Sequence, residues 1–205
     1  MGILNIFTST DFTTGVFTAV VAFFVIVLAI TVHEFVHAWS ANYLGDPTAR
    51  YAGRLTLNPI AHLDLVGSIM LVLVGFGWGK PVPINPNNFQ NPRLGSALTS
   101  IAGPISNLAF ALVLGFIYKL PISYGSFWST IILYAILINL ILMIFNLIPI
   151  PPLDGSKFFA LFFPQLENPS LAAYGIFLLL AFVFLGGGTI LFQSATFLRT
   201  LIIGV

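Results

Sequence analysis

The sequence predicts an all-α polytopic membrane protein, on the basis of very low charge, high hydropathy and several apolar runs of span length. The chain has 205 residues, of which 58% are hydrophobic and only 6% are charged, and its mean hydropathy is +1.03. Soluble domains carry about 25% charged residues, so an ordinary soluble fold is excluded. A net charge of +1 offers no basic surface for nucleic acid, and the absence of cysteine excludes disulfides and thiolate metal sites. The expected surroundings of the chain are therefore the lipid bilayer.

Five apolar stretches are long enough to cross a bilayer, which takes about 20 apolar residues in a helix. The expected spans cover residues 14–38, 97–119, 127–149, 170–186 and 188–204. Three consecutive glycines separate the last two spans, so these spans are predicted to form a tight helical hairpin. We expect a single membrane domain over residues 1–205, with a core at about 14–160 and the C-terminal helical hairpin at about 170–204.

Residues 63–79 are apolar but short, and stretches of this kind are often re-entrant or interfacial instead of spanning. If this stretch does not cross, Lys119 is alone on its side of the membrane; if it crosses, the cations divide three against four. The six cations opposite Lys119 would be Arg50, Arg54, Lys80, Arg93, Lys157 and Arg199. The positive-inside rule favours the uneven division. We therefore predict about five full spans plus a re-entrant or β-hairpin-like segment between the first two, with residues 43–95 cytoplasmic and partly embedded in the membrane.

The first expected span ends in the sequence His33-Glu34-Phe-Val-His37. Histidines at positions i and i+4 project from one face of a helix and can bind one metal ion together. Glu34 lies about 100° around the helix from His33, which suits a carboxylate that takes a proton from a zinc-bound water. A packed histidine pair is the alternative, but ionisable groups inside a membrane are costly and usually functional. The pattern predicts a metal site near the cytoplasmic edge of the hydrocarbon.

A catalytic zinc site usually has three protein ligands, so the two histidines leave this one incomplete. Asp154 follows the third expected span, after prolines that end the helix and free the chain to present a carboxylate. If residues 63–79 do not cross, the first and third full spans run in the same direction, and Asp154 emerges on the same face as His37. Spacing alone leaves Asp154 open between a metal ligand and a loop carboxylate that caps the next helix. The other candidate ligands are Asp11, Asp46, His62, Asp64 and Glu167.

Taken in order, these motifs resemble the site-2 protease family of intramembrane zinc metalloproteases. Besides the histidine motif, the matching blocks are Pro151-Pro152-Leu-Asp154-Gly155 and residues 44–50, 53–59, 80–85 and 102–107. The similarity covers about residues 14–160 and is to the minimal prokaryotic branch, without a PDZ or CBS domain. It implies one Zn2+ per chain held by His33, His37 and Asp154, with Glu34 as general base and acid.

The resemblance also implies a function, which is hydrolysis of peptide bonds of transmembrane protein or peptide substrates by zinc-activated water. It implies a multi-pass location in a prokaryotic cell membrane, with the active site near the cytoplasmic side. A metal transporter and a catalytically silent membrane scaffold are the alternatives. A transporter predicts ligands near the bilayer centre and a repeated architecture, and the sequence shows no repeat. A scaffold does not explain why Glu34 stands beside both histidines.

Asparagines on two expected spans are candidates for supporting roles. Asn107 lies near the start of the second full span, level with the expected zinc, and the resemblance places the matching residue in the active-site region. We predict that Asn107 contacts the substrate or stabilises the transition state, with an interhelical hydrogen bond as the alternative. Asn139 and Asn146 share a helix face, and we predict that they join helices or orient a ligand.

Residues 80–85, Lys-Pro-Val-Pro-Ile-Asn, alternate so that Val82 and Ile84 share one face. Proline donates no backbone hydrogen bond, so the two prolines leave this segment with one edge that can pair fully. A protease must unwind a helical substrate before it attacks the backbone. We predict that Val82, Ile84 and Asn85 bind the substrate by accepting its unwound backbone as an added strand. A proline-rich surface loop is the alternative.

Overall fold

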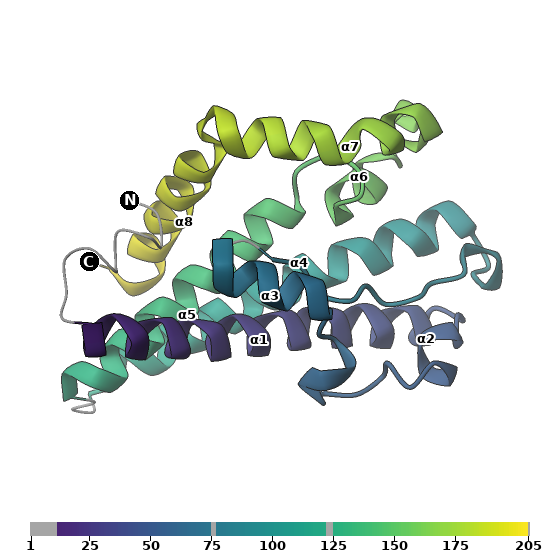
Figure 1. Cartoon of the computed structure of the whole chain (residues 1–205). Coiled ribbons are helices and arrows are strands. Elements are labelled where there is room, and N and C mark those ends of the chain that lie inside the picture. Colours follow the sequence, from purple (N-terminus) through teal and green to yellow (C-terminus); the bar gives the residue numbers. More distant parts are fainter. Residues whose placement is uncertain (1–11, 75–76, 122–124, 205) are drawn as a thin grey trace.

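A computed structural model of the chain describes residues 12–74, 77–121 and 125–204. The long helices are α1 (Phe12–Tyr43), α4 (Pro92–Lys119), α5 (Gly125–Asn146), α7 (Pro169–Phe182) and α8 (Gly188–Ile203). The short elements are the helices α2 (Thr48–Tyr51), α3 (Leu65–Val74) and α6 (Asp154–Phe159), the 3-10 turns η2 (Pro59–Ala61), η3 (Pro86–Asn88) and η4 (Pro164–Glu167), and the π-helical turn η5 (Val183–Gly187). The described residues contain no β-strand, which confirms a mostly helical fold (Figure 1).

Within the described chain, four helical segments are long and apolar enough to cross a membrane. They are Thr18–Tyr43, Pro92–Lys119, Phe127–Asn146 and Pro169–Ile203. The protein is therefore a multi-pass membrane protein. The first three segments correspond to the first three predicted full spans, and the difference lies at the C-terminus.

Helices α1, α4 and α5 pack against one another at the centre of the molecule, and α8 packs on α5 and α4 (Figure 1). The α4 face in this bundle carries small buried residues, including Gly95, Ala97, Gly103 and Ala111. Small side chains let helix backbones approach closely, which matters in a membrane because lipid tails are as apolar as the side chains. Ile136 on α5 is fully buried in the same core.

The directions of these helices decide what meets at each end of the bundle. His37 of α1 bonds the carbonyl of Thr99, and Ala29, two turns earlier, accepts a hydrogen bond from Asn107, so α1 and α4 are antiparallel. Helix α5 follows α4 and runs back along it, and therefore points in the same direction as α1. The end of α5 and the loop that carries Asp154 accordingly lie at the His37 end, as the predicted topology requires.

The two ends of the stretch 63–79 lie next to each other. Helix α3 occupies its first part, and Leu63 then pairs with Gly79 in an isolated antiparallel bridge. The Lys80 amide donates to the carbonyl of His62 at 2.8 Å. Because both ends of this stretch lie side by side, the stretch does not connect opposite ends of the bundle. It contains a helix, so the β-hairpin-like form of the prediction is wrong.

The predicted C-terminal hairpin is also wrong. Helices α7 and α8 continue into one another through the turn η5, in which Gly186 has φ 98°. Glycine tolerates positive φ, and here a single residue in that region bends the helix while its neighbours stay helical. The glycines therefore make a kink in one long segment, Pro169–Ile203, where the sequence pattern was equally consistent with a reversal.

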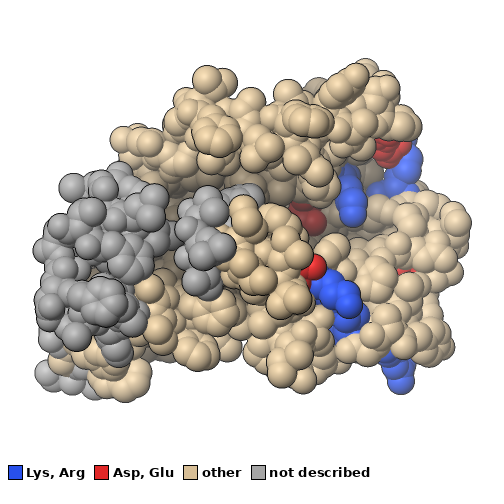
Figure 2. All heavy atoms as spheres, in the orientation of Figure 1, with Lys and Arg blue, Asp and Glu red and all other residues tan. Residues whose placement is uncertain are grey.

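Because the segment is kinked and does not reverse, one cation, Arg199, lies at the opposite end of the molecule from the one predicted. A side chain at Gly204, just after α8, would lie 3.9 Å from Nζ of Lys119, so α8 ends beside the end of α4. Arg199, in the last turns of α8, was one of the six cations expected opposite Lys119 but lies at the same end as Lys119. The other five of the seven cations lie toward the end that carries α2 and α6, where Figure 2 shows the Lys and Arg side chains gathered.

Candidate metal centre

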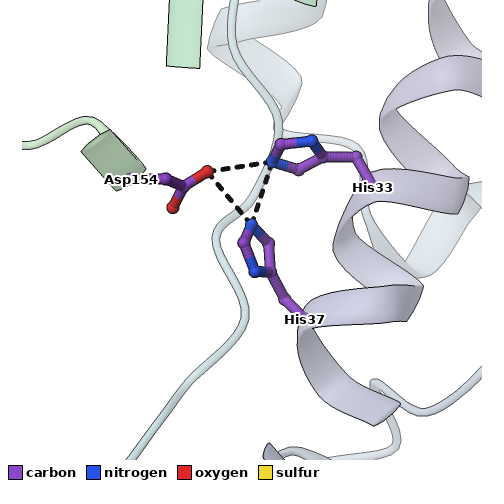
Figure 3. Close-up of side chains that lie close together, drawn as sticks. All are labelled: His33, His37 and Asp154. Carbon is purple, nitrogen blue, oxygen red and sulfur yellow. Dashed lines mark hydrogen bonds and ion pairs between the residues drawn. The ribbon is translucent and has the colours of Figure 1, made fainter. Parts of the chain in front are cut away.

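His33, His37 and Asp154 converge on one point at the edge of the bundle (Figure 3). The Nε2 atoms of the two histidines are 2.9 Å apart, and each is 3.1 Å from Oδ2 of Asp154. Both histidines are 5% exposed. Asp154 is the first residue of α6, and the residue at the cap position, Leu153, makes no side-chain cap. The structure therefore places Asp154 with the histidines instead of in a capping role.

The loop before Asp154 is shaped by close backbone contact. A Cβ at Gly155 would lie 2.4 Å from the carbonyl oxygen of Leu147, so the chain folds back on the end of α5 where only glycine fits. The Ser156 hydroxyl donates to the carbonyl of Leu153 at 2.7 Å and closes the first turn of α6. This tight return directs Asp154 toward α1.

Each histidine ring is oriented by an oxygen on its far side. Nδ1 of His37 is 2.7 Å from the carbonyl oxygen of Thr99, which can only accept, so this nitrogen carries the proton. Nδ1 of His33 is 2.6 Å from Oδ1 of Asn107, whose amide group donates to the carbonyl of Ala29 at 3.3 Å. That carbonyl fixes which end of Asn107 faces His33. Both Nε2 atoms are thus left with lone pairs directed toward Asp154.

Two lone pairs and a carboxylate oxygen at these distances repel one another unless a cation lies between them. Imidazole nitrogen and carboxylate oxygen are the ligand types that catalytic zinc sites use, and three of them leave a position open. Gly103 of α4 borders the cluster, where a Cβ would lie 2.3 Å from Nε2 of His37. The residues present therefore fit a bound divalent metal, with the room beside them kept by a glycine.

The charge of the Asp154 carboxyl depends on its two imidazole neighbours. Burial alone raises the pKa of the Asp154 carboxyl. The attraction of a charged His37 and hydrogen bonds from both imidazoles outweigh burial and hold that pKa well below its usual value. The Asp154 carboxylate is therefore ionised and available as a ligand at neutral pH.

Glu34 lies next to this cluster and is not part of it. Its Oε2 accepts a hydrogen bond of 3.0 Å from the backbone amide of Val82. Val82 belongs to residues 80–85, which we call the extended segment. In this segment the two prolines are exposed while Val82 and Ile84 are half-buried, which is the alternation that the sequence predicts. Asn85 closes the segment, and its amide donates to Oδ2 of Asp46 at 2.7 Å.

Asn107 makes interhelical hydrogen bonds, which was the alternative to contact with the substrate. The side chain is fully buried, and besides His33 and Ala29 it bonds Oδ1 of Asn139 at 2.9 Å. This interhelical network joins α1, α4 and α5 behind His33. The placement favours orientation of a ligand over contact with substrate. Asn146 bonds the carbonyl of Leu142 in its own helix.

His62, the other histidine considered as a ligand, is fully buried away from the cluster. Its Nε2 is 2.8 Å from the carbonyl oxygen of Thr56, and its Nδ1 is 3.4 Å from the Arg54 guanidinium. Sequence reasoning did not find Thr99, because it acts through its backbone carbonyl and any residue type supplies one. Asp46 was expected as a candidate ligand and Arg54 as one of the cytoplasmic cations, and the partners that the structure gives them depend on the fold.

Comparison with known proteins finds similarity to zinc metalloproteases. The sequence pattern of peptidase family M50 matches residues 117–186, a range that includes Asp154. A Bacillus subtilis protein named as a zinc metalloprotease, YwhC, is 45% identical over 140 residues, which are 64% of each chain. The chain is therefore similar to peptidase family M50 over these residues. These matches support the resemblance to the site-2 protease family.

Other relatives are similar over a comparable length. A Mycobacterium tuberculosis protein named as a zinc metalloprotease, Rip2, is 35% identical over 148 residues, which are 69% of this chain and 56% of the relative. The Mycolicibacterium smegmatis Rip2 is 33% identical over the same length. The chain therefore spans less than two thirds of the length of these relatives. No solved structure gives a significant match to this chain.

Proposed function

We propose that the protein is an intramembrane zinc endopeptidase that hydrolyses peptide bonds of transmembrane substrates. The observation that carries the proposal is the convergence of His33, His37 and Asp154 beside a carboxylate, Glu34, that is not needed as a ligand. A transporter needs ligands and a pathway but no such additional carboxylate. The names of YwhC and Rip2 support zinc as the metal.

The chain's own residues divide the chemistry between them. Zinc held by the three ligands supplies Lewis-acid chemistry, which polarises a peptide carbonyl and makes water a nucleophile near neutral pH. Glu34 accepts the proton of the attacking water and passes it to the leaving amine. The Val82 amide holds Oε2 of Glu34, which leaves Oε1 for the proton. Asn107 and Thr99 keep both imidazoles turned toward the metal position.

The extended segment is the proposed substrate-binding edge. Substrate backbone, once unwound, is held as a strand that pairs with Val82 and Ile84, with Asn85 at the end of the edge. The prolines cannot donate and the Val82 amide is taken by Glu34, so pairing uses the Val82 carbonyl and the Ile84 amide on the edge that faces Glu34. Figure 2 shows the surface hollowed between the upper layer of the molecule and the body below, with acidic atoms inside the hollow. Such a hollow suits access of a peptide to the site.

We place the protein in the cell membrane with the metal centre near the cytoplasmic side. Five of the seven cations lie toward the end that carries the metal centre, and the positive-inside rule assigns that end to the cytoplasm. Helix α3 is apolar, and its stretch begins and ends on this side, as a re-entrant segment does. The metal centre is then reached by water from the cytoplasm and by substrate from the bilayer.

The proposal is tested with purified wild type and Glu34→Gln in lipid vesicles that contain a single-span peptide. Wild type is expected to bind zinc and cleave the peptide, and the variant to bind zinc with cleavage at least about 100-fold slower. Zinc uptake into the vesicle lumen without cleavage would instead indicate a transporter. Zinc binding by both proteins with neither cleavage nor uptake would indicate a scaffold, and either result overturns the proposal.

A further inference from the structure

The backbone of the extended segment has no neighbouring strand among the described residues, yet three ionisable side chains occupy its polar groups. The Arg54 guanidinium donates to the carbonyls of Lys80 and Pro81, the latter at 3.3 Å. Glu34 accepts from the Val82 amide in the middle, and Asp46 accepts from the Asn85 amide at the far end. These side chains fix the two ends and the middle of the segment.

Asp46 is the stronger of the two end anchors. It is fully buried, and Oδ1 accepts from the Thr48 amide at 3.1 Å and from Nδ2 of Asn88 at 2.7 Å, in addition to the Asn85 bond. Burial alone raises the pKa of Asp46, but hydrogen bonds from Thr48, Asn88 and Asn85 outweigh it and hold that pKa below its usual value. The side chain is therefore a carboxylate. Charge-assisted bonds of this kind are about twice as strong as neutral ones.

Arg54 holds the other end. Only 6% of the residue is exposed, and its guanidinium reaches both backbone carbonyls while it also contacts His62 at 3.4 Å. His62 adds a second tie, because its own carbonyl accepts from the Lys80 amide at 2.8 Å. A buried guanidinium is costly, so these partners keep it in one place. Both ends of the extended segment are thus fixed to the chain that follows α1.

We propose that Asp46 and Arg54 are positioning residues that hold the extended segment in register and, through the Val82 amide, hold the carboxylate of Glu34 in place. The catalytic part of this inference rests on the proposed function. The metal ligands come from α1 and α6 and are oriented by α4, so loss of either anchor leaves the metal site intact. It lets the Val82 amide shift, and a displacement of about 1 Å costs on the order of 100-fold in rate.

The position of the segment is tested first without any catalytic assay. The chain has no cysteine, so single cysteines at Ile84 and, as a remote reference, at exposed Ser170 report local access by maleimide labelling. In an Asp46→Ala or Arg54→Ala background, labelling at position 84 is expected to accelerate about tenfold or more, in line with opening of a packed segment. Labelling at position 170 should stay constant. Arg50→Ala, which removes an exposed cation nearby, is the matched control.

Rescue separates an anchor from general damage. Asp46→Asn and Asn88→Asp each spoil the carboxylate–amide pair, while the double exchange restores this pair with the partners reversed, although the Thr48 amide loses its acceptor. Each single variant should lose about 10- to 100-fold in kcat with zinc content unchanged, and the exchange should recover part of it. Labelling unchanged in both anchor variants, or an exchange no better than the singles, overturns the proposal. If wild type itself cleaves nothing, the proposed function fails, and labelling still decides whether the anchors exist.

Discussion

The metal centre and the extended segment meet beside Glu34 but are held in different ways. The histidines sit on one long helix, and their far nitrogens bond Thr99 and Asn107 on α4. The extended segment has no helix or sheet of its own and depends on Asp46 and Arg54 for its place. The metal ligands are therefore fixed by the packing of the bundle, whereas the carboxylate of Glu34 is fixed by a network of ionised side chains. A substitution in the extended segment should therefore leave zinc binding intact, and a substitution in the metal centre should leave the position of the extended segment intact.

The largest expected effect is loss of the metal when Asp154 becomes asparagine. The neutral amide lacks the charge that balances a divalent ion between two imidazoles, so both zinc and cleavage should be lost. Zinc per chain is measured by atomic emission after dialysis. Asp64→Asn is the control, because the Asp64 carboxylate accepts from the amide of Gly67 in its own turn and lies outside the cluster, so the ion should stay bound. Full zinc content in Asp154→Asn would refute the ligand assignment.

A smaller loss is expected from Gly103→Ala. The added methyl group would lie 2.3 Å from Nε2 of His37 and 2.7 Å from Cε1 of His33, so both rings must move. Zinc affinity, measured by competition with a chelating dye, should fall about 10- to 100-fold, as for other disturbances around metal ligands. Gly188→Ala adds the same methyl group where nothing lies within 4 Å and should keep wild-type affinity. Equal affinity in both variants would mean that α4 does not press on the site.

Asn107→Ala should lower the affinity for zinc by about tenfold, although it removes no metal ligand. His33 loses the acceptor that keeps its Nδ1 protonated and its Nε2 turned toward the metal position. Ser106→Ala, which removes a hydroxyl bonded within α4, is the neighbouring control. If Asn107→Ala instead keeps full zinc affinity while kcat falls, Asn107 acts on the substrate or transition state, which is the role that the sequence predicted for it.

The smallest effect concerns pH and the extended segment. The folded-state pKa of Asp46 is lowered, so its contribution to stability is present above the unfolded pKa of about 3.9 and is lost as pH falls through the lower folded pKa. Asp46→Asn should melt a few degrees below wild type at pH 7, and the gap should narrow below about pH 4. Thermal unfolding in detergent measures both. A gap that stays constant across this range would contradict an ionised anchor.

The sequence predicted the parts of the molecule that depend on periodicity and hydropathy. Helical spacing identified His33 and His37, and the distribution of cations led to the topology that brings Asp154 to them. Hydropathy located the first three spans. These features follow from local rules that any membrane helix obeys.

Other features of the fold and the site depend on tertiary contacts that cannot be predicted from residue types. Three glycines read equally well as a reversal or a kink, and only the φ of Gly186 distinguishes them. Thr99 orients His37 through a backbone carbonyl. The sequence offered Asp46 as a candidate ligand and Arg54 as a cytoplasmic cation, and only the fold brings residues 80–88 against them. The sequence could not separate these cases because each is decided by tertiary packing.

The most direct test of the central claim is zinc K-edge X-ray absorption of wild type and Glu34→Gln. In the proposed site, His33, His37 and Asp154 bind the metal and Glu34 stays free for proton transfer. It predicts two imidazole ligands and an oxygen ligand at about 2.0–2.2 Å in both proteins, with unchanged spectra and with cleavage lost only in the variant. A spectrum that changes with Glu34→Gln, or a variant that cleaves as fast as wild type, would contradict it.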